Sequence, residues 1–134
     1  MDPESLELWR EQFSRSLRNH MPPEFPIVVC LCGSTRFYEE FQRANYRETM
    51  DGKIVLSVGH YPHSAETAHG EMTGCTAEQK IALDALHFRK LDLADEVLVL
   101  NVNDYIGEST AREMAHARKR GKVIRFLEPH QEGK

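Results

Sequence analysis

The hydrophobic pattern of this chain switches between continuous apolar runs and amphipathic stretches. The run over residues 27–32, Ile-Val-Val-Cys-Leu-Cys, has no polar residue at alternate positions, which is typical of a strand covered on both faces of a parallel sheet. Shorter apolar segments follow at intervals along the chain. The pattern predicts four strands, over residues 27–32, 53–58, 94–101 and 123–127.

Between these segments, apolar residues recur at helical spacing. The pattern predicts helices over the first twenty residues and over residues 37–50, 76–93 and 109–120. Thr76 with Gln79 three positions later forms a capping box that marks the start of the third helix. The alternation of strand and helix indicates right-handed crossovers and one open parallel sheet.

The N-terminal helix has its own apolar stripe, formed by Leu6, Trp9, Phe13 and Leu17. A proline-rich stretch after it, ending at Pro26, separates it from the first strand. We expect this stripe to pack within the chain or against a second copy of it in a homodimer. The alternative is that the protein is a scaffold whose N-terminal helix packs on another protein. We expect a single domain over residues 1–134, with the N-terminal helix in 1–22 and the α/β core in 27–127.

Composition narrows the class of protein. A chain of 134 residues fits one domain, and a formal charge of −4 gives no basic surface for polymeric nucleic acid. The longest apolar run is far shorter than the ~20 residues of a membrane helix, so no membrane partner is expected. Three cysteines do not make a disulfide framework, and the acidic N-terminus is not a signal peptide. We therefore expect a cytoplasmic protein.

Two polar, glycine-containing segments follow the first and third strands, at the sheet edge where open parallel sheets bind ligands. Backbone N–H groups at a helix N-terminus favour an anion, and an arginine can grip a phosphate with two hydrogen bonds. The candidate phosphate-binding residues are Gly33, Ser34, Thr35, Arg36, Gly107, Ser109 and Arg112. The alternative is plain helix capping, by Ser34 or Thr35 in the first segment and by a Thr110–Glu113 capping box in the second.

Glu113 is the main candidate for chemistry. It is expected in the first turn of its helix, near the sheet edge, where the helix dipole favours the ionised carboxylate that a nucleophile needs. His87, in the preceding helix, either packs there or points toward the ligand. Asp104 and Glu108 are candidate second carboxylates, whereas Asp95 and Glu96 are expected at the opposite end of the sheet.

A loop over residues 59–75 contains three histidines, His60, His63 and His69, together with Glu71 and Cys75. Their spacing matches no zinc pattern, and the loop has no Cys-x-x-Cys pair. We predict no metal and no cofactor, and interpret the loop as a cover over the substrate.

Three phrases of the sequence resemble the nucleoside 2-deoxyribosyltransferase-like superfamily, which includes the deoxynucleoside 5′-monophosphate N-glycosidases. They are the Cys-Gly-Ser-Thr-Arg of residues 32–36, the Leu-Ala-Asp-Glu-Val-Leu-Val-Leu of residues 93–100, and residues 107–117 followed by Gly-Lys-Val-Ile at 121–124. The resemblance implies a doubly wound, Rossmann-like or flavodoxin-like fold in a homodimer or higher oligomer. It also implies a small-molecule nucleoside or nucleotide as the ligand.

By the same resemblance, Glu113 is the glutamate that attacks the sugar C1′ and displaces the base, while Gly33, Ser34 and Arg36 hold the substrate. His87 or Asp104 would protonate or orient the departing base. Water would then complete hydrolysis, or a second base would complete a transfer. The alternative is a protein of the same fold that binds or senses a nucleotide or an NAD-derived metabolite without turning it over.

Overall fold

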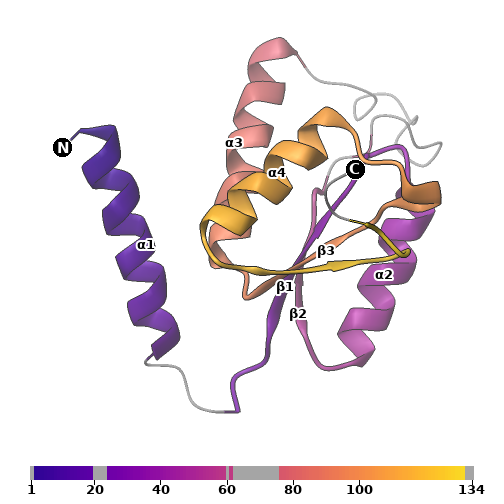
Figure 1. Ribbon diagram of the computed structural model, residues 1–134, viewed down its shortest axis with the longest axis horizontal. Coiled ribbons are helices and arrows are strands. Elements are labelled where there is room, and N and C mark those ends of the chain that lie inside the picture. The colour runs from indigo at the N-terminus through magenta and orange to yellow at the C-terminus, as the bar shows by residue number, and fades with distance from the viewer. Residues whose placement is uncertain (1, 20–23, 60, 62–75, 132–134) are drawn as a thin grey trace.

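A computed structural model describes residues 2–19, 24–59, 61 and 76–131 of the chain (Figure 1). The elements in chain order are α1 (Pro3–Asn19), β1 (Val28–Cys32), α2 (Tyr38–Met50), β2 (Ile54–Leu56), α3 (Ala77–Leu93), β3 (Glu96–Val99), the 3₁₀ turn η2 (Val102–Asp104), α4 (Glu108–Lys119) and β4 (Val123–Phe126).

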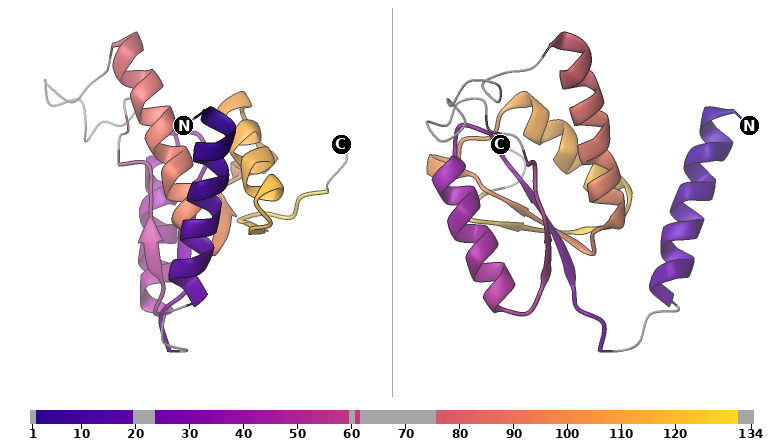
Figure 2. Two further views of the ribbon diagram at one scale, coloured as in Figure 1. Left: turned by 90° about the vertical axis from the view of Figure 1, so that its left-hand side faces the viewer. Right: turned by 180° about the vertical axis from the view of Figure 1, so that it is seen from behind.

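The four strands form one parallel sheet in the order β2-β1-β3-β4. Helix α2 covers one face, and α3 and α4 cover the other (Figures 1 and 2). The predicted α/β class is therefore confirmed, and the arrangement is consistent with a Rossmann-like or flavodoxin-like fold. From β1 the chain goes to one side for β2 and to the other for β3, so the strand order reverses between β1 and β3. Crevices for ligands form at the carboxyl ends of strands at such a point.

The two central strands are buried on both faces, as the continuous apolar runs predict. Successive residues of β1 alternate between the faces, so Val29 and Leu31 pack on the α2 side with Phe41. Cys30 and Cys32 belong to the cluster on the α3–α4 side. Because side chains alternate between the two faces along β1, both thiols point toward α3 and α4.

The predicted boundaries of the helices differ from the observed ones by one residue or so at most ends, and the Thr76–Gln79 capping box is present. The Gln79 N–H donates to the Thr76 hydroxyl over 3.0 Å, and the Thr76 N–H donates to Gln79 Oε1 over 2.8 Å. The strands are shorter than predicted, notably β2 and β3, because backbone pairing stops before the apolar sequence does.

Helix α1 lies beside the α/β core and is joined to it by ion pairs (Figure 2). The Arg120 guanidinium, at the end of α4, pairs with Glu7 and Glu11 of α1 and with Asp92 of α3. Two residues of the predicted stripe, Trp9 and Phe13, stack with ring centroids 5.2 Å apart, and each is about half exposed. Within the described residues, no helix combines the length and the apolarity needed to cross a bilayer.

A charged cluster sits at the amino end of the sheet, on the α2 side. The buried Glu48 carboxylate pairs with Arg125 and with Lys53 Nζ at 3.2 Å. Glu96 lies 3.2 Å from Lys53 Nζ and 2.8 Å from Arg125. Asp95 accepts the backbone N–H of Val28 over 2.8 Å at the same end. Asp95 and Glu96 thus lie opposite the predicted ligand edge, as expected.

Candidate functional site

A buried polar cluster joins β1, α3 and α4 at the carboxyl end of β1. His87 Nε2, from α3, lies 3.4 Å from Cys32 Sγ and 3.9 Å from Cys30 Sγ. The same nitrogen lies 3.7 Å from Glu113 Oε1, from α4. The structure therefore brings together two of the three predicted catalytic residues, His87 and Glu113, and adds two thiols to them.

Burial dominates the electrostatics of Glu113. It raises the pKa of this carboxyl to about 7, although the charge of His87 and a hydrogen bond with Cys32 act in the opposite direction. Because α4 begins at Glu108, Glu113 lies in its second turn and not in the first. The prediction that the helix dipole would favour the ionised form of Glu113 is therefore wrong. Removal of water from the carboxyl group favours the neutral form more strongly, because the effect of the dipole fades beyond the first turn.

The thiols and His87 influence one another. A hydrogen bond from Cys32 holds the pKa of the Cys30 thiol below its usual range, and the same contact, together with burial, raises the pKa of Cys32. Burial on its own would lower the pKa of His87, but the hydrogen bond and charge of Cys30 and the charge of Glu113 raise it overall. The cluster can therefore hold a proton on the imidazole beside the carboxyl group.

Two buried atoms of this cluster have no hydrogen-bond partner among the described residues. They are His87 Nδ1 and Glu113 Oε2. Buried polar atoms in native proteins are nearly always satisfied, so these two atoms call for a partner that the described residues do not supply. Both atoms belong to residues that the sequence assigns to chemistry.

The first predicted phosphate segment, Gly33–Arg36, follows β1 directly. Ser34 closes a turn, since its carbonyl accepts the Phe37 N–H over 3.0 Å and its hydroxyl lies 3.3 Å from the Arg36 N–H. Helix α2 begins after Phe37 with no side-chain cap, so the alternative in which Ser34 or Thr35 caps it is wrong. At Gly33 a Cβ would lie 3.2 Å from the Leu100 carbonyl oxygen, which explains why glycine fits this approach to β3.

The second predicted segment, from Gly107 to Arg112, opens α4. Gly107 is the N-cap and provides no side-chain cap, while Thr110 is buried inside the first turn. The alternative Thr110–Glu113 capping box is therefore wrong, because the helix begins about one turn earlier than that box requires. Arg112 donates to the Ser109 hydroxyl over 3.2 Å on the exposed side of this turn.

The two segments meet through Tyr105. The Arg36 guanidinium carbon lies 4.9 Å from the centre of the Tyr105 ring, and the Phe37 ring contacts the same ring edge-on at 6.0 Å. Contacts of a guanidinium with an aromatic face are favourable by about 0.5–1 kcal/mol at exposed sites. The predicted convergence of the loops that follow β1 and β3 is thus present in the structure.

Asp104 occupies a different position from His87 and Glu113. It adopts a left-handed backbone conformation with φ 57° in η2, accepts a hydrogen bond from the Asn101 amide over 3.0 Å, and pairs with His130 Nδ1 at 2.8 Å. These contacts link the β3 end to the segment after β4. Glu108, the other candidate second carboxylate, is exposed at the start of α4.

The histidines His60, His63 and His69, with Glu71 and Cys75, lie outside the described residues.

What the sequence analysis missed is the pair of thiols beside His87. The available signal was the spacing of Cys30 and Cys32, since residues two positions apart in a strand point to the same face.

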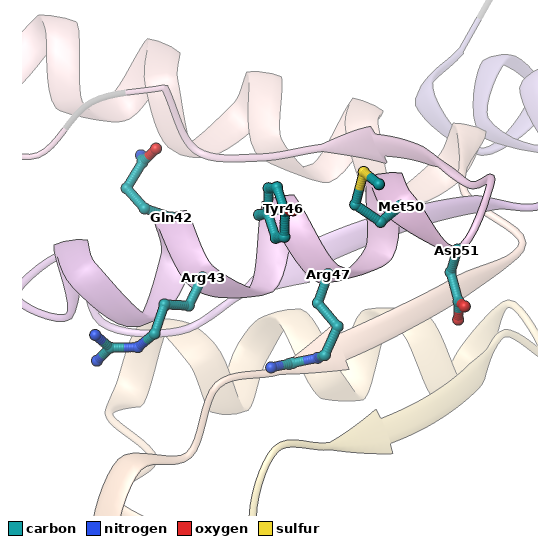
Figure 3. A pocket seen from close by; sticks show the side chains of 6 residues that line it. All are labelled: Gln42, Arg43, Tyr46, Arg47, Met50 and Asp51. Carbon is teal, nitrogen blue, oxygen red and sulfur yellow. The ribbon is translucent and has the colours of Figure 1, made fainter.

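A shallow groove also runs along the outer side of α2, where six side chains lie along the helix (Figure 3). They are Gln42, Arg43, Tyr46, Arg47, Met50 and Asp51. Tyr46 and Met50 are each about 70 % exposed. The groove lies on α2, across the sheet from the thiols, and its six described lining residues include no neighbouring imidazole and carboxyl group. We therefore place the candidate site at the Cys30–Cys32–His87–Glu113 cluster.

Comparisons with family models, with curated proteins and with solved structures gave no match to this chain.

Proposed function

We propose that this chain cleaves the N-glycosidic bond of a nucleoside or nucleotide, as a hydrolase or a base transferase, with Glu113 as the nucleophile. The observation that carries the proposal is the placement of a buried carboxyl group 3.7 Å from the His87 imidazole at the carboxyl end of β1. Sequence resemblance to the nucleoside 2-deoxyribosyltransferase-like superfamily assigns the attacking glutamate to the same residue.

The chemistry follows from this pair. One Glu113 oxygen forms a bond to the sugar C1′ as the bond from C1′ to the base nitrogen breaks, and the bonding electrons leave with the base. His87 gives a proton to the departing base or orients it. Water then attacks C1′ and releases the sugar from Glu113, or a second base does so and completes a transfer.

The loops at the sheet edge support a phosphate-bearing substrate. Arg36 and Arg112 both lie on exposed segments that follow the central strands, and the first turn of α4 offers free backbone N–H groups. A 5′-phosphate held there would leave the sugar facing Glu113. Arg36→Ala and Arg112→Ala should then raise KM for monophosphates more than for nucleosides.

The test measures, by chromatography, the free base that is released from a panel of nucleosides and nucleoside 5′-monophosphates. Glu113→Gln is the central variant, because it keeps the shape of the side chain and removes the nucleophile. Glu39→Gln, exposed on α2 over the other face of the sheet, is the control. We expect wild type and Glu39→Gln to release base and Glu113→Gln to lose at least about a hundredfold in kcat. Full turnover by folded Glu113→Gln would refute the proposal.

The second candidate is a binding protein for a nucleotide or an NAD-derived metabolite. The burial of Glu113, whose side chain is 15 % exposed, favours it, because a nucleophile must reach its substrate. In that case a nucleotide raises the melting temperature and no base appears.

Location and assembly are part of the proposal. Cys30 and Cys32 are free thiols, in keeping with a reducing compartment such as the cytoplasm. The half-exposed Trp9 and Phe13 support a homo-oligomer that covers the α1 stripe. The molar mass in solution, compared with that of a chain lacking residues 1–20, tests this assembly.

A further inference from the structure

Three potential metal ligands converge at the carboxyl end of β1. Cys30 Sγ, Cys32 Sγ and His87 Nε2 all lie within 4.8 Å of one another, and all three residues are buried. Strand geometry fixes the two thiols on one face, and α3 presents the imidazole to both. Glu113 Oε1 lies 3.7 Å from the imidazole nitrogen and stands beside this group of three without belonging to it.

The spacing of these atoms matches a tetrahedral zinc site. Bond lengths of about 2.3 Å to sulfur and 2.0 Å to nitrogen place neighbouring sulfur and nitrogen ligands about 3.5 Å apart. The observed separations from His87 Nε2 to the two sulfurs are 3.4 and 3.9 Å. The three donors therefore fit three corners of the tetrahedron, and the fourth corner is left for water or another ligand.

The donor set also selects the type of ion. Two thiolates and one imidazole suit zinc and similar borderline ions, whereas magnesium and calcium prefer oxygen ligands.

We propose that Cys30, Cys32 and His87 bind one zinc-class divalent cation, with water in the fourth position. Each metal–sulfur bond forms as the thiol proton leaves to solvent, and the oxidation state of the metal and of the sulfur is unchanged. A consequence, which rests on the proposed function, is that the ion occupies His87 Nε2, the nitrogen that faces Glu113 and would act on the departing base. The cation is then an inhibitor of base release.

The test uses Co²⁺ as a spectroscopic substitute for Zn²⁺ on the full chain, after treatment with a chelator and a thiol reductant. We expect one equivalent of Co²⁺ to produce thiolate-to-cobalt absorption in the near ultraviolet and the strong visible bands of a tetrahedral ion. One equivalent of Zn²⁺ should abolish both. The absence of thiolate-to-cobalt absorption in the wild-type protein would overturn the proposal.

The cysteine count provides the decisive control. The sequence has three cysteines, so a band that persists in Cys75→Ser must come from Cys30 and Cys32. We expect Cys75→Ser to keep the spectrum, and Cys30→Ser, Cys32→Ser and His87→Gln to weaken Co²⁺ binding by more than about tenfold. Loss of the thiolate band in folded Cys75→Ser would overturn the assignment, and this control does not require a buried residue of the cluster to be replaced.

The spectrum and base release separate the two proposals. Cobalt bands without base release from any substrate would support the metal site and refute the glycosidase. Base release with no cobalt bands would refute the metal site alone. Base release that falls as Zn²⁺ is added, in Cys75→Ser as in wild type, would support both.

Discussion

Glu48→Gln tests the charged cluster at the amino end of the sheet. The Glu48 side chain is only 5 % exposed and accepts hydrogen bonds from both Lys53 and Arg125. Glutamine removes the negative charge and turns an amide N–H₂ toward two cations. Breaking a buried ion pair by removing one partner costs about 3–5 kcal/mol. Because Arg125 is 35 % exposed and Glu96 still neutralises part of the charge, we expect about 2 kcal/mol here.

The stability that Glu48 contributes should depend on pH, and the pKa of its carboxyl group sets the direction of that dependence. Burial on its own would raise the pKa of Glu48, but the hydrogen bonds from Arg125 and Lys53 lower it below its ordinary value of 4.5. A carboxyl whose folded pKa is lowered stabilises the fold fully above that ordinary value and loses this stabilisation as pH falls through the folded pKa. The difference between wild type and Glu48→Gln should therefore be full at pH 7 and shrink below pH 4.5.

Urea unfolding at pH 7 and at two values below pH 4.5 measures this difference, and a shift of roughly 8 °C in melting temperature at pH 7 should accompany it. Glu40→Gln is the control, because its pair with Arg43 is exposed at the surface and should contribute less than about 0.5 kcal/mol. A Glu48→Gln protein as stable as wild type at pH 7, or a difference that stays constant with pH, would refute the reasoning.

Three further substitutions test the packing and the local structure around the site. Gly33→Ala should cost about 1–3 kcal/mol in urea unfolding, since the new Cβ lies 3.2 Å from Leu100 Cβ and carbonyl oxygen; a neutral effect would contradict the close approach. Leu91→Ala, fully buried between α3 and the sheet, should cost about 2–5 kcal/mol, and a loss below 1 kcal/mol would contradict the packing. Thr76→Ala should cost about 1 kcal/mol and Thr76→Ser much less, because serine keeps the oxygen that caps α3; equal losses would argue against the capping box.

Much of the fold could be predicted because its signals are local. The apolar run over residues 27–32 lies on a strand buried on both faces, and the Thr76 cap lies one residue before α3 begins. The ends of the strands could not be predicted as well, because pairing depends on the neighbouring strand. Leu127, for example, continues the backbone pairing with Val99 after the last residue of β4.

The site could be predicted only in part. The positions of His87 and Glu113 relative to the sheet edge follow from the strand–helix alternation, and the two residues do lie together. Their contact with Cys30 and Cys32 depends on which face of β1 α3 covers, and no local pattern contains that information. The same long-range packing removes water from Glu113, which is why a dipole argument based on sequence position failed for its ionisation.

The two thiols of β1 belong to the apolar core and to the polar cluster at once. In a laboratory selection for heat resistance, valine at positions 30 and 32 would keep the core filled but would take from the buried His87 its sulfur partners, which lowers stability unless His87 becomes apolar as well. Variants that gain melting temperature at these positions should therefore lose the cysteines and His87 together, and with them the surroundings of Glu113. The choice of cysteine at these positions thus sets thermostability against the chemistry available at the end of β1.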